Sequence, residues 1–135
     1  MAGESSRHVR LVEQLISIVE TRHAVDNRLI ILADHVRFGA NRPPKLGGFV
    51  PDLFAHDLPI TARIVGEAKT EHDLETDRSL AQLGAFLDHL ALYENSTMYV
   101  AVPFTYAARA RTLLRSLSQE RHAAVSLHIL AIVMR

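Results

Sequence analysis

The chain has 135 residues, the length of one compact domain, and contains no cysteine, which excludes disulfides, cysteine-based zinc sites and thiol catalysis. Hydrophobic residues make up 48% and charged residues 22%, proportions that exclude a disordered tail or linker. Fifteen basic residues balance fifteen acidic ones, which excludes the strongly basic coat of many nucleic-acid-binding proteins.

The N-terminal segment predicts a helix that begins at Ser5 or Ser6 and ends near His23. Its β-branched residues recur at intervals of three and four and form one apolar stripe. These residues are Val9, Val12, Ile16 and Val19. We therefore expect this helix to cover one face of a sheet.

Three strands are predicted in succession after this helix. They are Leu29–Ala33, Phe49–His56 and Ala62–Lys69, and the first is apolar and β-branched enough to be buried. A segment rich in Gly and Pro over residues 39–48 predicts a loop before the second strand, and residues 57–61 turn the chain before the third.

The C-terminal half alternates helices and strands. The predicted elements are a polar segment over Thr70–Thr76, a helix capped by Thr76 or Asp77, a strand over Tyr99–Val102 that ends at Pro103, a helix over Thr105–Gln119 and a strand over Val125–Met134. Leucines form the inward faces of the two helices. They are Leu80, Leu83, Leu87 and Leu90 in the first, and Leu113, Leu114 and Leu117 in the second.

The order α-β-β-β-α-β-α-β predicts one α/β domain over residues 1–135. Its mixed five-stranded sheet would be flanked by helices, with an antiparallel meander first and parallel crossovers later. The last strand is so apolar that we expect it at a central position, covered on both sides.

Polar residues on the second and third strands indicate a catalytic site. Glu67 and Lys69 are two residues apart, so they share a face of the sheet. A turn that pairs Asp57 with Ala62 sets an antiparallel register. In that register Asp52 lies opposite Glu67, with Cβ atoms about 4.5–5.5 Å apart. Two carboxylates this close repel unless a cation neutralises them, and Mg²⁺ prefers such oxygen ligands.

A metal held there suits the hydrolysis of a phosphodiester, because it can activate water and stabilise charge on the phosphoryl oxygens. Lys69 would orient the attacking water or share that charge, and Gln82, near the start of the next helix, can reach the site. The alternative is a solvent-facing pair of strands joined by salt bridges, with Gln82 merely exposed.

Together these motifs resemble the PD-(D/E)XK nuclease superfamily. Pro51-Asp52 and Glu67-Ala68-Lys69, with fourteen residues between the two acids, resemble its two-part motif. Gln82 with Phe86 resembles the Gln-x-x-x-aromatic helix motif, with Phe where Tyr is frequent. The predicted order of elements is also similar to the restriction-endonuclease-like core of that family.

The resemblance implies a role for each matched residue. It implies Asp52 and Glu67 as metal ligands, Ala68 as the donor of a backbone carbonyl, Lys69 as the catalytic lysine and Gln82 as an accessory group. Many members add an acidic residue from the first helix, for which Glu13 is the leading candidate and Glu20 the alternative. The implied activity is Mg²⁺-dependent cleavage of DNA, with Mn²⁺ as a substitute, in repair, recombination or processing.

Substrate binding is assigned to a loop that leads into the strand bearing Asp52. It carries Arg37, Arg42 and Lys45 together with flexible glycines, a composition that can hold phosphates. The acidic segment over residues 71–77 predicts a hydrated loop beside the site. The arginines of the Thr105–Gln119 helix are assigned to a solvated face.

The expected partner is DNA, and a homodimer and a protein partner in a repair pathway follow from the resemblance. The alternative function is a non-catalytic nucleic-acid-binding or assembly module that keeps the nuclease fold. The longest apolar runs are too short to span a bilayer, and the first seven residues lack the apolar core of a signal peptide. A cytoplasmic protein without a membrane partner is therefore expected.

Overall fold

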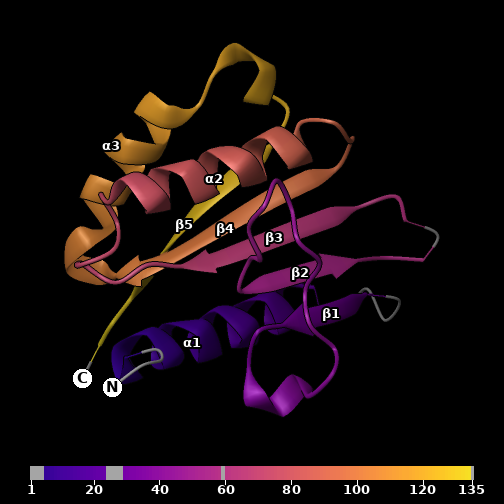
Figure 1. Ribbon diagram of the computed structural model, residues 1–135, viewed down its shortest axis with the longest axis horizontal. Coiled ribbons are helices and arrows are strands. Elements are labelled where there is room, and N and C mark those ends of the chain that lie inside the picture. The colour runs from indigo at the N-terminus through magenta and orange to yellow at the C-terminus, as the bar shows by residue number, and fades with distance from the viewer. Residues whose placement is uncertain (1–4, 24–28, 59, 135) are drawn as a thin grey trace.

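Residues 5–23, 29–58 and 60–134, which the computed structural model describes, form a mixed five-stranded sheet with helices on both faces (Figure 1). The strands are β1 (Ile30–Ala33), β2 (Leu53–His56), β3 (Arg63–Ala68), β4 (Ser96–Pro103) and β5 (Ser126–Ile132). They lie side by side in chain order, antiparallel from β1 to β3 and parallel from β3 to β5. The predicted fold class and order of elements are confirmed.

Three α-helices cover the sheet and divide its core into two clusters. They are α1 (Ser6–Arg22), α2 (Asp77–Leu90) and α3 (Ala107–Leu117), and the short 3₁₀ helices are η1 (Val36–Phe38), η2 (Phe104–Tyr106) and η3 (Glu120–His122). Helix α1 packs on one face of the sheet, whereas α2 and α3 pack on the other (Figure 1). In the described part of the chain, no helix is long and apolar enough to cross a membrane.

Helices α1 and α2 begin at capping side chains, whereas α3 has no side-chain cap. The Ser5 hydroxyl accepts a hydrogen bond from the His8 N–H at 3.1 Å and starts α1. The apolar stripe of α1 is wider than predicted, because Leu11 and Leu15 are fully buried beside it, while Val9 is half-buried. Thr76, and not Asp77, caps α2, in which Leu83, Leu87 and Leu90 are buried and Leu80 is only half-buried.

The register predicted for the β2–β3 pair is confirmed. Leu53 lies opposite Gly66, so the residues just beyond them, Asp52 and Glu67, meet at the end of the ladder. The Asp57 carboxylate fixes the turn by accepting hydrogen bonds from the Thr61 hydroxyl and from the Thr61 and Ala62 N–H groups, at 2.7 and 2.8 Å for the two N–H groups. These bonds, the one from the Thr61 hydroxyl first, lower the pKa of Asp57 to about 2.

Two predictions about strand position were wrong. β5 is an edge strand rather than a central one, and its residues alternate between exposed and covered. β1, predicted to be buried, is the opposite edge and is only partly covered. Both strands are apolar because helices cover the faces of the sheet. Whether a strand lies at the edge or in the centre depends on how the chain connects the strands, and the amino-acid composition of a strand does not indicate this.

Several boundaries also differ from those predicted. β2 begins only at Leu53, because Phe49 pairs back onto Leu46 around Gly47 and Gly48, both of which have positive φ. β4 extends over Ser96–Pro103, and α3 starts later than predicted because η2 precedes it.

Gly66→Ala is expected to lower the free energy of unfolding by about 1–3 kcal/mol, because a Cβ there would lie 3.0 Å from Leu15 and 3.2 Å from Leu53 in a closely packed layer. Gly84→Ala is the matched control, since nothing lies within 4 Å of the added Cβ in the interior of α2. The control should gain about 0.5–1 kcal/mol. Guanidinium unfolding measures both, and equal effects would contradict the packing described for Gly66.

Candidate active site

A cavity of about 400 Å³ opens at the end of the sheet where β3 stops and α2 begins. This is the place where the antiparallel and parallel halves of the sheet meet. Most of the side chains that line it are polar. They include His8, Asp34, Asp52, Glu67, Lys69, Asp73, Thr76, Arg78, Ser79 and Gln82. The four predicted catalytic residues are all among them, so the structure brings these four together.

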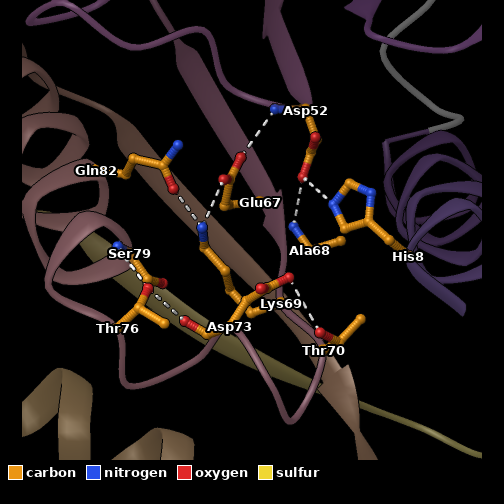
Figure 2. A network of polar contacts seen from close by, with 10 residues as sticks. All are labelled: His8, Asp52, Glu67, Ala68, Lys69, Thr70, Asp73, Thr76, Ser79 and Gln82. Carbon is orange, nitrogen blue, oxygen red and sulfur yellow. Dashed lines mark hydrogen bonds and ion pairs between the residues drawn. The ribbon is translucent and has the colours of Figure 1, made fainter. Parts of the chain in front are cut away.

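Asp52 and Glu67 are held by reciprocal hydrogen bonds between their side chains and the backbone (Figure 2). The Asp52 N–H donates to Glu67 Oε1 at 2.9 Å, and the Ala68 N–H donates to Asp52 Oδ2 at 2.8 Å. Both acids are buried, with exposed fractions of 7% and 4%. The end of the strand ladder therefore fixes the two carboxylates side by side.

Lys69 lies between Glu67 and Gln82. Its ammonium Nζ is 3.2 Å from Glu67 Oε2 and donates a hydrogen bond to Gln82 Oε1 (Figure 2). The lysine side chain is buried, and Gln82, in the second turn of α2, is half-buried. A charge at this depth has few alternative partners, so the amide oxygen and the carboxylate fix the position of Nζ.

Burial and the neighbouring Asp52 charge together raise the pKa of Glu67 to about 8, although the Lys69 ammonium acts in the opposite direction. One lysine therefore does not compensate two buried carboxylates. At neutral pH the pair holds a proton or gains from an additional cation. A hard divalent ion meets that requirement better than a proton does, because it carries two positive charges and takes several oxygen ligands.

The donor set fits Mg²⁺ in a site completed by water and substrate. Among the residues that the structure describes, no group of three His, Asp or Glu side chains is placed to hold a metal ion. Mg²⁺ commonly binds through one or two carboxylates and retains water or phosphate oxygens for its other positions. Asp52 and Glu67, with the Ala68 carbonyl nearby in sequence, supply that smaller set.

Neither candidate for the first-helix acid, Glu13 or Glu20, lines the cavity. Glu13 pairs with His35 at 3.1 Å and has a half-exposed side chain, and Glu20 pairs with Arg37 at 3.0 Å. Residue 13 lies about 7.5 Å further along the helix axis than the turn that reaches the cavity. His8 occupies that turn instead, with Nε2 3.4 Å from Asp52 Oδ2. The capped start of α1 could have indicated it, because the Ser5 cap places His8 in the first turn of the helix.

The loop cations predicted to bind substrate do not line the cavity. Arg37 pairs with Glu20, and Lys45 is exposed. Arg42 pairs with Asp34, and Asp34 but not Arg42 lines the cavity. A cation other than Lys69 that lines the cavity is Arg78, in the first turn of α2. Sequence reasoning missed it, although a residue two positions after the Thr76 cap must lie at the end of the helix nearest Lys69.

The acidic segment that precedes α2 is more ordered than predicted. Leu74 is buried in the core with 1% exposure, and Glu71 forms an ion pair with Arg7 at 2.7 Å. Asp73 lines the cavity and accepts a hydrogen bond from the Thr70 hydroxyl at 3.0 Å. This segment is therefore part of the cavity wall.

No protein-family model, curated protein or solved structure matches the chain. The class that the fold and the cavity define is thus a small α/β domain with a buried carboxylate–lysine site at the end of its sheet.

Proposed function

We propose that the protein is a Mg²⁺-dependent nuclease of the PD-(D/E)XK type that hydrolyses phosphodiester bonds in DNA. One observation carries this proposal: Asp52, Glu67 and Lys69, each more than nine-tenths buried, converge at the wall of an open cavity. Burying three ionisable groups is costly, and such groups cluster at functional sites. A purely structural pair of strands gains little from salt bridges and has no need to bury them.

Each residue of the site has its own role in the proposed hydrolysis. Asp52, Glu67 and the Ala68 carbonyl would hold the metal, which when bound supplies a Lewis acid and lowers the pKa of coordinated water. Gln82 positions the Lys69 ammonium by accepting its hydrogen bond. Lys69 orients the attacking water or shares the negative charge that develops on the phosphoryl oxygens.

The distribution of charged residues supports a DNA substrate that is attracted by the site itself rather than by a basic protein surface. Arg37, Arg42 and Arg109 are each paired with a carboxylate, so they offer little free positive charge to phosphates. Non-specific binding to DNA should therefore be weak, and the metal provides much of the positive charge at the scissile phosphate.

The test incubates the purified chain with branched, single-stranded and duplex DNA in Mg²⁺, in Mn²⁺ and in EDTA. Cleavage in the two metals but not in EDTA is expected for at least one substrate. An inert chain that also binds no Mn²⁺ between Asp52 and Glu67 would overturn the proposal in favour of the non-catalytic nucleic-acid-binding or assembly module. The predicted homodimer is checked in the same preparation by sedimentation.

His8→Ala is expected to raise the Mg²⁺ concentration needed for half-maximal cleavage by about 10- to 100-fold, because His8 is placed beside one carboxylate oxygen of the metal ligand Asp52. His35→Ala is the matched control, since His35 pairs with Glu13 outside this cavity. A metal titration of cleavage separates the two variants. An unchanged requirement for metal in His8→Ala would show that this histidine does not position Asp52.

A further inference from the structure

The first turn of α2 forms one wall of the cavity, opposite the strand ends that carry the acids. Helix α2 has fourteen residues, and its N-terminal N–H groups present the positive end of the helix dipole. Thr76, Arg78 and Ser79, which surround this turn, all line the cavity. The Arg78 guanidinium carbon lies 5.4 Å from the centre of the Phe49 ring, so the charged group itself is placed over an aromatic face.

The Ser79 hydroxyl is a buried polar group without a partner. Ser79 has an exposed fraction of 1%, and its Oγ makes no hydrogen bond with any residue that the structure describes. Its N–H is already used, because it donates to the Thr76 hydroxyl at 3.1 Å. Figure 2 shows the Ser79 side chain on the side of α2 that faces Lys69. A buried hydroxyl left unpaired lowers stability, which is consistent with a donor kept for a ligand.

Ser79 lies next to the reacting centre without being part of it. Ser79 and Gln82 are three residues apart in a helix, so they lie on the same face one turn from each other. Gln82 contacts Lys69, whereas Ser79 lies about 4.5 Å nearer the start of the helix. The Ser79 hydroxyl therefore lies beside the position proposed for the scissile phosphate, displaced toward the start of α2.

The side chains that line the cavity favour an anion at the first turn of α2 rather than elsewhere in the cavity. Asp34, Asp52, Glu67 and Asp73 line the rest of the cavity and repel negative charge. The first turn of α2 combines a hydroxyl, backbone N–H groups and a guanidinium, and the acid in this turn, Asp77, is not among the residues that line the cavity. Phosphate oxygens accept hydrogen bonds from all three donors, and helix N-termini are favourable sites for them.

We infer that the first turn of α2 binds the phosphate next to the scissile one on the same DNA strand. This inference rests on the proposed nuclease function and deepens it, because it names the substrate class: a strand with at least two consecutive phosphates, and not a mononucleotide ester. Ser79 and Arg78 are the residues that contact the second phosphate, and the reacting phosphate stays with Lys69 and the carboxylates.

The first experiment needs no catalysis. Inorganic phosphate is titrated in EDTA into the ¹⁵N-labelled full chain, and amide shifts are followed by NMR. Shifts centred on the first turn of α2 are expected, and Ser79→Ala and Arg78→Gln should each weaken binding about tenfold or more. Arg109→Gln is the matched control, because Arg109 is an exposed arginine paired with Glu75. Ser79→Ala should melt at or above the wild-type temperature, since it removes an unpaired hydroxyl.

The second experiment uses DNA with a single neutral methylphosphonate linkage placed beside the scissile phosphate. The neutral linkage should lower kcat/KM for the wild type at least tenfold, and should have little further effect in the double variant Ser79→Ala, Arg78→Gln. Cleavage that ignores the neighbouring linkage, or phosphate shifts that avoid α2, would overturn the inference while the nuclease proposal stands. Phosphate shifts at α2 without cleavage of any DNA would overturn the nuclease proposal and retain the anion site.

Discussion

Lys69→Met is expected to reduce the rate of Mg²⁺-dependent DNA cleavage by about 100- to 1,000-fold, the loss typical of removing one preorganised stabilising group from an active site. Methionine keeps the length and apolar stem of lysine but removes the ammonium that lies between Glu67 and Gln82. The loss should fall on kcat, because Lys69 acts on the water or on charge that develops in the transition state.

Lys45→Met is the control for this prediction, because Lys45 is an exposed lysine outside the cavity. It should cleave DNA at the wild-type rate. Thermal melting of both variants tests whether the fold is retained. Cleavage by folded Lys69→Met within a few-fold of the wild type would remove the lysine from the mechanism.

Glu67→Gln is expected to abolish metal-dependent cleavage and to change how stability depends on pH. The pKa of Glu67 lies near 8 in the folded chain against 4.5 for the free side chain, so between these values the folded state binds more protons than the unfolded state. The free energy of unfolding therefore falls as pH rises through this window, by about 3 kcal/mol between pH 4.5 and pH 7. The glutamine variant should lack this contribution.

Chemical denaturation across this pH range, without and with Mg²⁺, measures both effects. Mg²⁺ should stabilise the wild type most at the upper end of the window, where Glu67 must otherwise ionise without a sufficient counter-charge, and should stabilise Glu67→Gln much less. Asp57→Asn is a useful control, because it alters an acid at the far end of the same hairpin. Equal stabilisation of wild type and Glu67→Gln by Mg²⁺ would contradict a metal site at this acid.

The hairpin could be predicted from local chemistry. The Asp57 carboxylate caps the short turn and so fixes which residues of β2 and β3 pair. Because the register is the same along the whole hairpin, it also places Asp52 opposite Glu67. Alternation along β3 then places Lys69 beside Glu67. Each step uses neighbours in sequence or residues directly opposite in a ladder, so no tertiary information was required.

Contacts between distant elements could not be predicted in this way. The charge of Glu13 makes it a plausible ligand, but the packing of α1 on the sheet decides which turn of the helix meets β2, and that turn carries His8. Arg78 was missed for a similar reason, since its role depends on where α2 starts relative to the end of β3. The edge position of β5 depends on the direction of a crossover that hydrophobicity does not encode.

The reciprocal bonds of Asp52 and Glu67 give these two acids a second task, which is to close the open end of a strand pair. If the proposed activity were lost, replacing either acid with a residue that has no side-chain acceptor would still lower stability, because one buried backbone N–H group would lose its partner. In the part of the chain that the structure describes, Lys69 Nζ contacts the side chains of Glu67 and Gln82. Selection for folding alone would therefore keep a side-chain acceptor at positions 52 and 67, which Asn or Gln also supplies, whereas the proposed metal site needs the acids themselves.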